Sequence, residues 1–533
     1  MKAAVITKRL VHHLSILWLS KCRADVEQRL NRLAAAGTRR FEGTTLIDGT
    51  FDNPNYWFRL SILRAAKGTH HGREVCVLGP FRAASAKRTA QRLGIMEAVH
   101  FPGDMEISSG HQRLAETLVA SLRSPDDLMK WDLPYGAPAW DLYDGLLKRQ
   151  RLASLDISHP LLARHVAEYM RDLDVADSIV NQVKPDFAVL SHTASARTNY
   201  GALTWQLSRR NVPVIVPQGG YGNLTHFKIN KFEDVFNHPN RPSRAEIDEL
   251  SAERRDMLHD VGRRYIAARI SGQTSDLAAV QAFQEGKVNI TRGSLCALYG
   301  WSLEKPIVAV FASVWFDNPH TFGMTEFRDF HEWLQSTIAV ACGSTHVNWL
   351  FKPHPSENWY GGVKLRDLLP KDLPAHVRIA EDDWDGAQLR DCLRGIVTLH
   401  GTGGVEMAAV GKPVLVAARG WYADVGFVAW PRSRQAYFDA LASQWWENLD
   451  LVEARRLAEI FAGYYFCKPG GGGSITLPDD SIQHLALPRL KTMLASQGED
   501  IAHEVATMSA WLDSDTQHYH VFKMKHADCY ELP

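Results

Sequence analysis

The chain has 533 residues, more than one compact hydrophobic core normally supports, so two or three domains are expected. Hydrophobic residues make up 45% of the sequence and charged residues 23%, proportions that are typical of globular proteins and exclude a mainly disordered chain. The 60 Lys and Arg residues balance 60 Asp and Glu residues, so the excess of basic charge typical of nucleic-acid binders is absent. These values indicate a multidomain globular protein that does not act on nucleic acid.

The cysteines and the apolar runs indicate the cellular compartment in which the protein is found. The seven cysteines are scattered without the CxxC spacing of zinc or redox sites, and an odd, scattered set is typical of a reducing compartment. The longest apolar run, residues 307–316, has about half the ~20 residues of a membrane-spanning helix. No small-residue cleavage site cleanly follows the short N-terminal apolar stretch, so we expect no signal peptide. We therefore expect a cytoplasmic protein.

Residues 1–43 combine apolar and basic positions at helical spacing, which predicts a helical N-terminal extension. The favoured interpretation is that this extension packs on the neighbouring domain. The alternative is a peripheral contact with the cytoplasmic face of the inner membrane.

Residues 44–300 are predicted to form a first Rossmann-like domain. Short apolar segments alternate with helical segments, a pattern typical of a parallel sheet with helical crossovers. The polar, largely helical stretch at the end of this region is interpreted as a connector to the next domain. The predicted strands are residues 44–48, 74–78, 98–101, 187–191 and 212–216.

Residues 301–440 repeat the pattern and are predicted to form a second Rossmann-like domain, followed by a helical C-terminal region over residues 441–533. The sequence thus predicts an α/β protein with two parallel sheets and helical extensions at both ends. The predicted strands of the second domain are residues 307–312, 347–351, 396–399 and 413–417.

The segment IVTLHGTGGVEMAAVGKPVLV, residues 396–416, is the most informative in the chain. It reads as a strand, a glycine loop, a short helix and a second strand. Glycines leave room for a ligand, and the first N–H groups of a helix favour a phosphate group. His400 lies at the carboxyl end of the strand, where open α/β sheets bind ligands, and Glu406 could accept hydrogen bonds from ribose hydroxyls. The loop is therefore predicted to bind phosphate, and the alternative is that its glycines only permit tight packing.

The segment FKPHP, residues 351–355, also follows a predicted strand. Lys352 offers a compact positive charge for phosphate, and His354 offers a hydrogen bond or a proton near neutral pH. Because both follow a parallel strand, we expect them at the same sheet edge as His400.

Polar residues also follow the predicted strands of the first domain. Asp48 and His192 are candidates for a general base. The alternative is that Asp48 belongs to an ordinary Asp-Gly turn and that His192 is structural. Residues 218–223, QGGYGN, are a further polar loop after a strand. Together these strand-end residues could form the second wall of a crevice.

The KPHP motif, the HGTGGVEMAAVGKPV motif and the pairs Trp421-Tyr422 and Gly426-Phe427 together resemble the bacterial capsular polysaccharide biosynthesis proteins. These include Kdo-transferase-like glycosyltransferases of the GT-B architecture. The resemblance extends over about residues 290–440 and is vaguer over 44–225. It implies two Rossmann-like domains that face each other across a cleft, with an activated sugar nucleotide mainly on the second domain and the acceptor mainly on the first.

The activity implied by this resemblance is metal-independent transfer of a sugar from a CMP- or UDP-sugar onto a surface polysaccharide or glycolipid, without a cofactor. The Thr-Gly-Gly of the loop departs from relatives with Ser-Thr-Val-Gly, which leaves the nucleotide open. The alternatives are a sugar-nucleotide 2-epimerase of the same architecture, a polyol-phosphate transferase and a non-enzymatic partner of polysaccharide export. The predicted catalytic residues are Asp48, His192 and Lys352, and the predicted nucleotide-sugar-binding residues are His354, His400, Gly401, Thr402, Gly403, Gly404 and Glu406.

Overall fold

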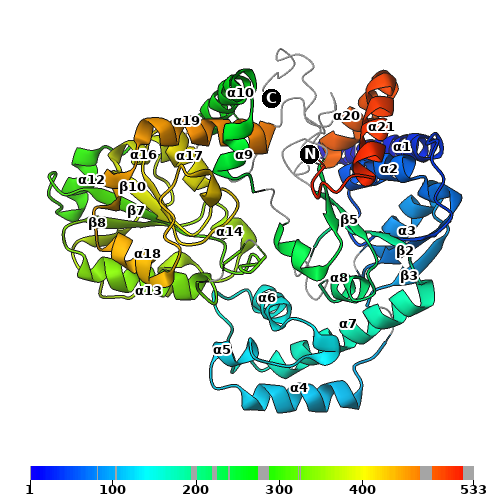
Figure 1. Cartoon of the computed structure of the whole chain (residues 1–533), viewed down its shortest axis with the longest axis horizontal. Coiled ribbons are helices and arrows are strands. Elements are labelled where there is room, and N and C mark those ends of the chain that lie inside the picture. Colours follow the sequence, from blue (N-terminus) through cyan, green and yellow to red (C-terminus); the bar gives the residue numbers. More distant parts are fainter. Residues whose placement is uncertain are drawn as a thin grey trace.

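The computed structural model contains two α/β halves, each built around its own sheet (Figure 1). The prediction of two domains with mainly parallel sheets is confirmed. The structure describes residues 2–80, 82–102, 105–193, 201–218, 225–237, 241–273, 287–321, 323–324, 326–467 and 483–519.

Among the described residues, the first sheet has six strands in the order β3-β2-β1-β4-β5-β6. Its neighbouring strands are parallel except for β5 and β6, which are antiparallel. The five predicted strands are present, and β6 is an additional edge strand. The bounds are β1 Thr44–Asp48, β2 Arg73–Leu78, β3 Glu97–His100, β4 Phe187–Val189, β5 Val214–Gln218 and β6 Thr225–Ile229.

In the part of the chain that the structure describes, the second sheet has five parallel strands in the order β11-β10-β7-β8-β9. The four predicted strands are present, and the short β9 is an addition. The bounds are β7 Ile307–Phe311, β8 Asn348–Lys352, β9 Val377–Ile379, β10 Gly395–Thr398 and β11 Val414–Val416.

Helices cover both faces of each sheet. Those of the first half are α1 Lys2–Ala35, α2 Pro54–Lys67, α3 Ala83–Arg92, α4 Ser109–Ser121, α5 Pro125–Leu128, α6 Ala139–Gln150, α7 Leu162–Val183, α8 Gly201–Ser208, α20 Gln483–Ser496 and α21 Gly498–Leu512. Those of the second half are α9 Arg244–Glu249, α10 Ala252–Ile270, α12 Arg292–Tyr299, α13 Phe330–Gly343, α14 Glu357–Tyr360, α15 Leu365–Leu368, α16 Gly386–Cys392, α17 Gly403–Ala409, α18 Arg434–Leu441 and α19 Leu451–Ala462.

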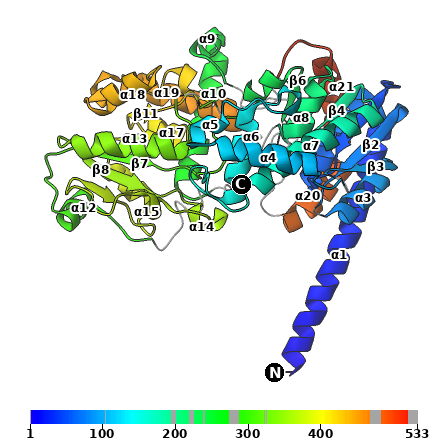
Figure 2. The ribbon, with the colours of Figure 1, turned by 90° about the horizontal axis from the view of Figure 1, so that it is seen from below.

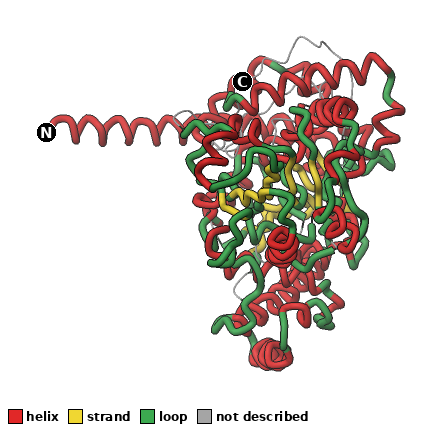
Figure 3. Tube along the Cα trace, turned by 90° about the vertical axis from the view of Figure 1, so that its left-hand side faces the viewer, coloured by secondary structure: helices red, strands yellow, loops and turns green. Residues whose placement is uncertain are grey.

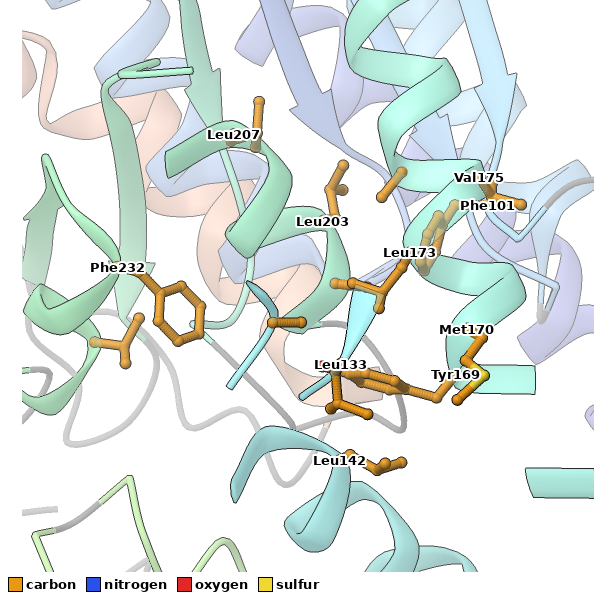
Figure 4. Packing of buried hydrophobic residues seen from close by; sticks show 14 of the residues in the cluster. Phe101, Leu133, Leu142, Tyr169, Met170, Leu173, Val175, Leu203, Leu207 and Phe232 are labelled. Carbon is orange, nitrogen blue, oxygen red and sulfur yellow. The ribbon is translucent and has the colours of Figure 1, made fainter. Parts of the chain in front are cut away.

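The alternation of side chains along each central strand explains why these strands are apolar throughout. In β2, Val75 and Val77 enter the core beneath α7 and α8, whereas Cys76 enters the opposite core against α1 and α2. Figure 4 shows part of the first of these cores, where Leu173 of α7 and Leu203 of α8 pack together. A strand that is buried on both faces has no solvent side on which to place polar residues.

The packing divides the chain differently from the sequence prediction. Residues 247–273 and 287–296, placed with the first domain as a connector, contribute buried side chains such as Leu258 and Leu295 to the core of the second half. The C-terminal region is itself divided. Helix α19 packs on α10 in the second half, whereas α20 and α21 return to the first half and pack on α1 and α2.

Helix α1 is the long N-terminal helix predicted from the sequence. Its C-terminal part buries Cys22, Val26 and Leu30 in the first half, so packing on the domain is confirmed for this part. The beginning of α1 extends away from the body of the molecule (Figures 2 and 3). None of the helices in the described part of the chain combines the length and the apolar composition that crossing a bilayer requires.

Buried polar contacts join α6 of the first half to the second half. Tyr143 donates to Oδ2 of Asp329 at 2.5 Å, and Ser154 donates to the same oxygen at 2.6 Å. Asp144 contacts Nδ1 of His320 at 2.6 Å. Because Asp144 and Asp329 are fully buried, these contacts fix how α6 sits against the second half.

Candidate functional site

The loops that follow β7, β8 and β10 meet at the carboxyl edge of the second sheet, because these three strands are neighbours and run parallel. They enclose a cavity of about 150 Å³. Part of the predicted set comes together there: Lys352, His354, Gly401, Thr402, Gly403 and Glu406 line this cavity, whereas His400 and Gly404 do not. The polar and glycine residues of its wall are Arg269, Lys352, His354, Gly386, Arg390, Thr398, Gly401, Thr402, Gly403 and Glu406.

The glycine loop turns directly into α17. The amide of Gly404 donates to Gly401 O at 2.9 Å, and the amide of Glu406 donates to Thr402 O at 3.2 Å. A Cβ atom on Gly403 would lie 2.9 Å from the Phe311 ring, so this position is restricted to glycine by the strand beside it. The loop thus lines the cavity with backbone atoms, because larger side chains at the glycine positions would fill the cavity.

Gly404 has a different role from the other glycines of the loop. It does not line the cavity, and a Cβ atom at this position would lie 2.2 Å from the hydroxyl oxygen of Tyr422. That hydroxyl donates to Gly401 O at 2.9 Å. Tight packing against Tyr422 therefore explains why position 404 requires a glycine, and this packing maintains the shape of the loop.

Lys352 ends β8 and lies against the ring of Phe311, with Nζ 5.4 Å from the ring centroid. Within the described part of the chain its ammonium group has no hydrogen bond or ion pair. Burial lowers the pKa of Lys352 to about 8; the positive charge of Lys287 contributes to the lowering, and the charges of Glu406 and Asp382 oppose it. An anion in the cavity would supply a direct ion-pair partner.

His354 is held by the turn that follows β8. Its Nδ1 accepts a hydrogen bond from the amide of Ser356 at 3.2 Å, and its carbonyl accepts one from the amide of Glu357 at 3.0 Å. With Nδ1 used as an acceptor, the neutral ring carries its proton on Nε2. His354 can therefore act as a hydrogen-bond donor in the cavity wall.

Glu406 forms a buried ion pair that the sequence did not predict. Its Oε1 accepts from Nε of Arg269 at 2.5 Å, and Arg269 and Glu406 are only 3% and 8% exposed. Arg269 comes from the last turn of α10, within the stretch interpreted as a connector. Arg390 of α16 is another basic cavity residue that sequence reasoning missed. Neither arginine lies near a recognisable motif, and a basic residue near the end of a helix is common.

His400 lies at the predicted sheet edge but is not part of the cavity wall. Its ring packs near Phe330, with 5.8 Å between ring centroids, and its carbonyl accepts from the indole of Trp421 at 2.8 Å. Burial lowers the pKa of His400 to about 4, and the charge of Arg241 contributes to the lowering. The imidazole is therefore neutral at physiological pH, and its chain neighbour Gly401 is the residue that lines the cavity.

Asp48 is fully buried, and both of its carboxylate oxygens accept backbone hydrogen bonds. Oδ1 accepts from Thr50 at 2.7 Å, and Oδ2 accepts from Ser191 at 2.9 Å. The side chain therefore fastens the loop after β1 to the loop after β4. This geometry favours the structural alternative for Asp48 over a role as a general base.

His192 is half-buried beside these loops, with Nδ1 at 2.8 Å from the hydroxyl of Ser191 and its ring in edge contact with Phe51. Its role as a base stays a prediction. Residues 219–223 of the predicted polar loop lie outside the described residues. In the part of the chain that is described, no group of three His, Cys, Asp or Glu side chains is arranged to hold a metal ion.

No protein-family model matches the chain, and no curated protein matches it. Among solved structures, the β-Kdo 2,4-transferase KpsC of Thermosulfurimonas dismutans has 14% identity and a TM-score of 0.33, over 52% of this chain and 78% of that one. The glycosyltransferase SnogD of Streptomyces nogalater has 14% identity and a TM-score of 0.23, over 85% and 100%. The UDP-GlcNAc 2-epimerase of Neisseria meningitidis, bound to UDP-GlcNAc, has 11% identity and a TM-score of 0.27, over 80% and 96%. At these scores and identities, the likeness carries no argument about what this chain does.

Proposed function

We propose that the chain is a glycosyltransferase that moves a sugar from a CMP- or UDP-sugar onto a surface polysaccharide or glycolipid. The observation that carries the proposal is the cavity at the carboxyl edge of the second sheet. It combines a glycine loop at the start of a helix with Lys352 and His354, which are groups suited to binding phosphate. The sequence resemblance to capsular polysaccharide biosynthesis proteins supports the choice of reaction.

The size of the cavity determines which part of the donor it holds. A volume of about 150 Å³ is below the ~300–1,000 Å³ of pockets that take a whole drug-sized ligand. We propose that it holds the phosphate end of the nucleotide, with Glu406 accepting from a ribose hydroxyl through the oxygen that Arg269 does not occupy. The transferred sugar then projects toward the first half.

In the proposed reaction, the oxygen of an acceptor hydroxyl attacks the anomeric carbon of the donor sugar. The bond from that carbon to the phosphate oxygen breaks, and the nucleotide leaves with the added negative charge. Lys352, His354 and the loop amides stabilise this charge, which is the kind of interaction that contributes most to such catalysis. The acceptor proton passes to a base, for which we propose His192.

The test is a thermal-shift panel with CMP, UMP and GMP at about 100 times the dissociation constant, where binding stabilises by roughly 2.7 kcal/mol. We expect CMP or UMP to stabilise the native chain. Lys352→Met should lose this stabilisation, whereas the exposed Lys371→Met should keep it. The proposal fails if no nucleotide stabilises the native chain.

A second assay separates transfer from 2-epimerisation, which would use the same nucleotide site without an acceptor. The chain is incubated with the sugar nucleotide in the presence and absence of an oligosaccharide acceptor, and the products are identified by mass spectrometry and NMR. We expect nucleotide release to depend on the acceptor. A changed configuration at C2 of the donor without acceptor would identify an epimerase instead.

A further inference from the structure

A second and larger cavity lies between the two halves. Its volume is about 780 Å³, within the ~300–1,000 Å³ typical of small-ligand sites. The first half contributes Trp140 of α6 and Phe236, and the second half contributes Phe327 and Trp430.

Three arginines of this wall form ion pairs. Arg328 contacts Asp126 at 2.7 Å, and Arg434 contacts Glu332 at 2.7 Å. Arg419 contacts Asp424 at 2.6 Å. Arg241 has no carboxylate within ion-pair distance among the residues that the structure describes.

Arg241 is nevertheless held in a defined position. Its Nε donates to the carbonyl of Gly420, and its Nη1 donates to the carbonyl of Phe236. Burial lowers the pKa of Arg241 to about 10, and the nearby Arg419 contributes, so the side chain remains charged at neutral pH. A partly buried cation without a counter-ion is costly unless an anion joins it.

The aromatic side chains give the cavity a second property. Trp140 packs against Phe236 with ring centroids 5.1 Å apart, and Trp430 carries the guanidinium of Arg432 at 3.8 Å from its ring. Large, rigid rings of this kind offer apolar faces together with polar edges. The apolar face of a sugar ring is a suitable partner for such a wall, whereas a free inorganic anion gains nothing from it.

We propose that this cavity binds a sugar that carries an anionic group, with Arg241 holding the anion and the aromatic wall contacting the ring. The inference rests on the proposed function in one respect, that the bound sugar is the acceptor. His400 supports this location, because a Cβ atom on Gly420 would lie 2.4 Å from the Cβ of His400. Arg241 donates to the carbonyl of Gly420, which packs on His400, and the chain neighbour of His400, Gly401, lines the smaller cavity.

The experiment measures binding of D-glucuronate, glucose 6-phosphate, D-glucose and inorganic phosphate to the full chain by saturation-transfer NMR and calorimetry. We expect at least one of the two anionic sugars to bind about tenfold or more tightly than both glucose and inorganic phosphate. Comparison of glucuronate with glucose 6-phosphate then distinguishes a carboxylate from a phosphate ligand. The proposal is overturned if glucose or inorganic phosphate binds as tightly as the anionic sugars, or if none of the probes binds.

Variants locate the site. Arg241→Met should weaken binding of the anionic sugar about tenfold or more and leave glucose unaffected, and Arg241→Lys should restore part of the affinity. The matched control is Arg244→Met, because Arg244 is exposed, pairs with Asp248 and Glu453 and does not line the cavity. Trp430→Leu leaves Arg241 in place and should weaken glucose and glucuronate alike. Equal binding by the Arg241→Met and Arg244→Met variants would overturn the assignment.

Nucleotide titration of the same variants separates this inference from the proposed function. If CMP or UMP binds but no anionic sugar does, the cavity assignment fails and the nucleotide site stands. If anionic sugars bind through Arg241 but no nucleotide binds, the proposed transferase fails and the sugar site stands.

Discussion

Lys352 brings a charge close to the proposed phosphate and forms no ion pair with any residue that the structure describes. Its position at the end of β8 was predicted from the sequence, but its lowered pKa was not, because that follows from burial between Phe311 and the loops of neighbouring strands. A lysine whose pKa is near 8 loses its charge within an accessible pH range. This makes its role in nucleotide binding measurable.

Nucleotide affinity should therefore fall as the pH rises through about 8. Below this pH Lys352 is protonated and attracts phosphate, and above it the amine is neutral, while a phosphate monoester with a second pKa of ~6 keeps its charge throughout. Calorimetric titration of CMP or UMP between about pH 7 and pH 9 measures the effect. In Lys352→Met the profile should be flat, and an unchanged slope in this variant would contradict the assignment.

The Arg269–Glu406 pair should stabilise the second half. Arg269→Met leaves the Glu406 carboxylate buried without its partner, which is expected to cost about 3–5 kcal/mol. Urea denaturation measures the loss. Arg263→Met on the same helix is the control, because Arg263 is 53% exposed and its pair with Asp260 contributes about 1 kcal/mol or less. Equal losses of unfolding free energy in the two variants would show that burial of the Arg269–Glu406 ion pair does not determine its contribution to stability.

His192 should separate chemistry from binding. If it accepts the proton of the acceptor hydroxyl, His192→Ala abolishes transfer and leaves donor affinity unchanged. Asp48→Asn should instead reduce stability, because Asp48 holds two backbone amides in a buried site. Assays of sugar transfer, nucleotide titration and thermal unfolding measure the transfer rate, the donor affinity and the stability of each variant. Transfer at the native rate by His192→Ala would leave the reaction without an identified base.

At the scale of elements, the glycine loop and α17 depend on Tyr422 as much as on their own sequence. Gly404→Ala places a methyl group against the Tyr422 hydroxyl, so either the loop or the tyrosine must move. We expect Gly404→Ala to lower both thermal stability and nucleotide affinity. Tyr422→Phe removes the blocking oxygen, so the double variant should lose less than the sum of the single variants. Strict additivity would indicate that the two residues do not act on one another.

The elements differ in how well the sequence predicts them. The apolar stretches of β8 and β10 predicted strands, and the carboxyl ends of these strands therefore located Lys352 and the glycine loop. Strand β6 was not predicted, because polar residues such as Lys228 are not expected in a buried strand. Lys228 can be buried because its Nζ donates a hydrogen bond to Trp511 O at 2.8 Å, and this partner lies 283 residues away in the chain. Arg269 was missed for the same reason, since only tertiary packing brings α10 to the cavity.

At the scale of the molecule, the first half is completed by the end of the described chain. Trp511 of α21 is 5% exposed, and Lys228 of β6 lies 4.7 Å from its ring centroid. Trp511→Ala should cost about 3–5 kcal/mol, as expected for a large buried aromatic. Hydrogen exchange should accelerate in α2 and β1 but not in α10 or α17. The exposed Val452→Ala in α19 is the control, and faster exchange throughout both halves would contradict a local effect.

The return of α20 and α21 to the first half also has a consequence for how the protein is made. Synthesis delivers β1 to β6 before any strand of the second sheet, yet α1 and α2 of the first half are covered by helices that leave the ribosome only after α19. The second half has all of its described helices once α19 has emerged. Apolar side chains of the nascent first half therefore stay exposed until the second half has been translated. The core of the half that is translated first is thus completed last.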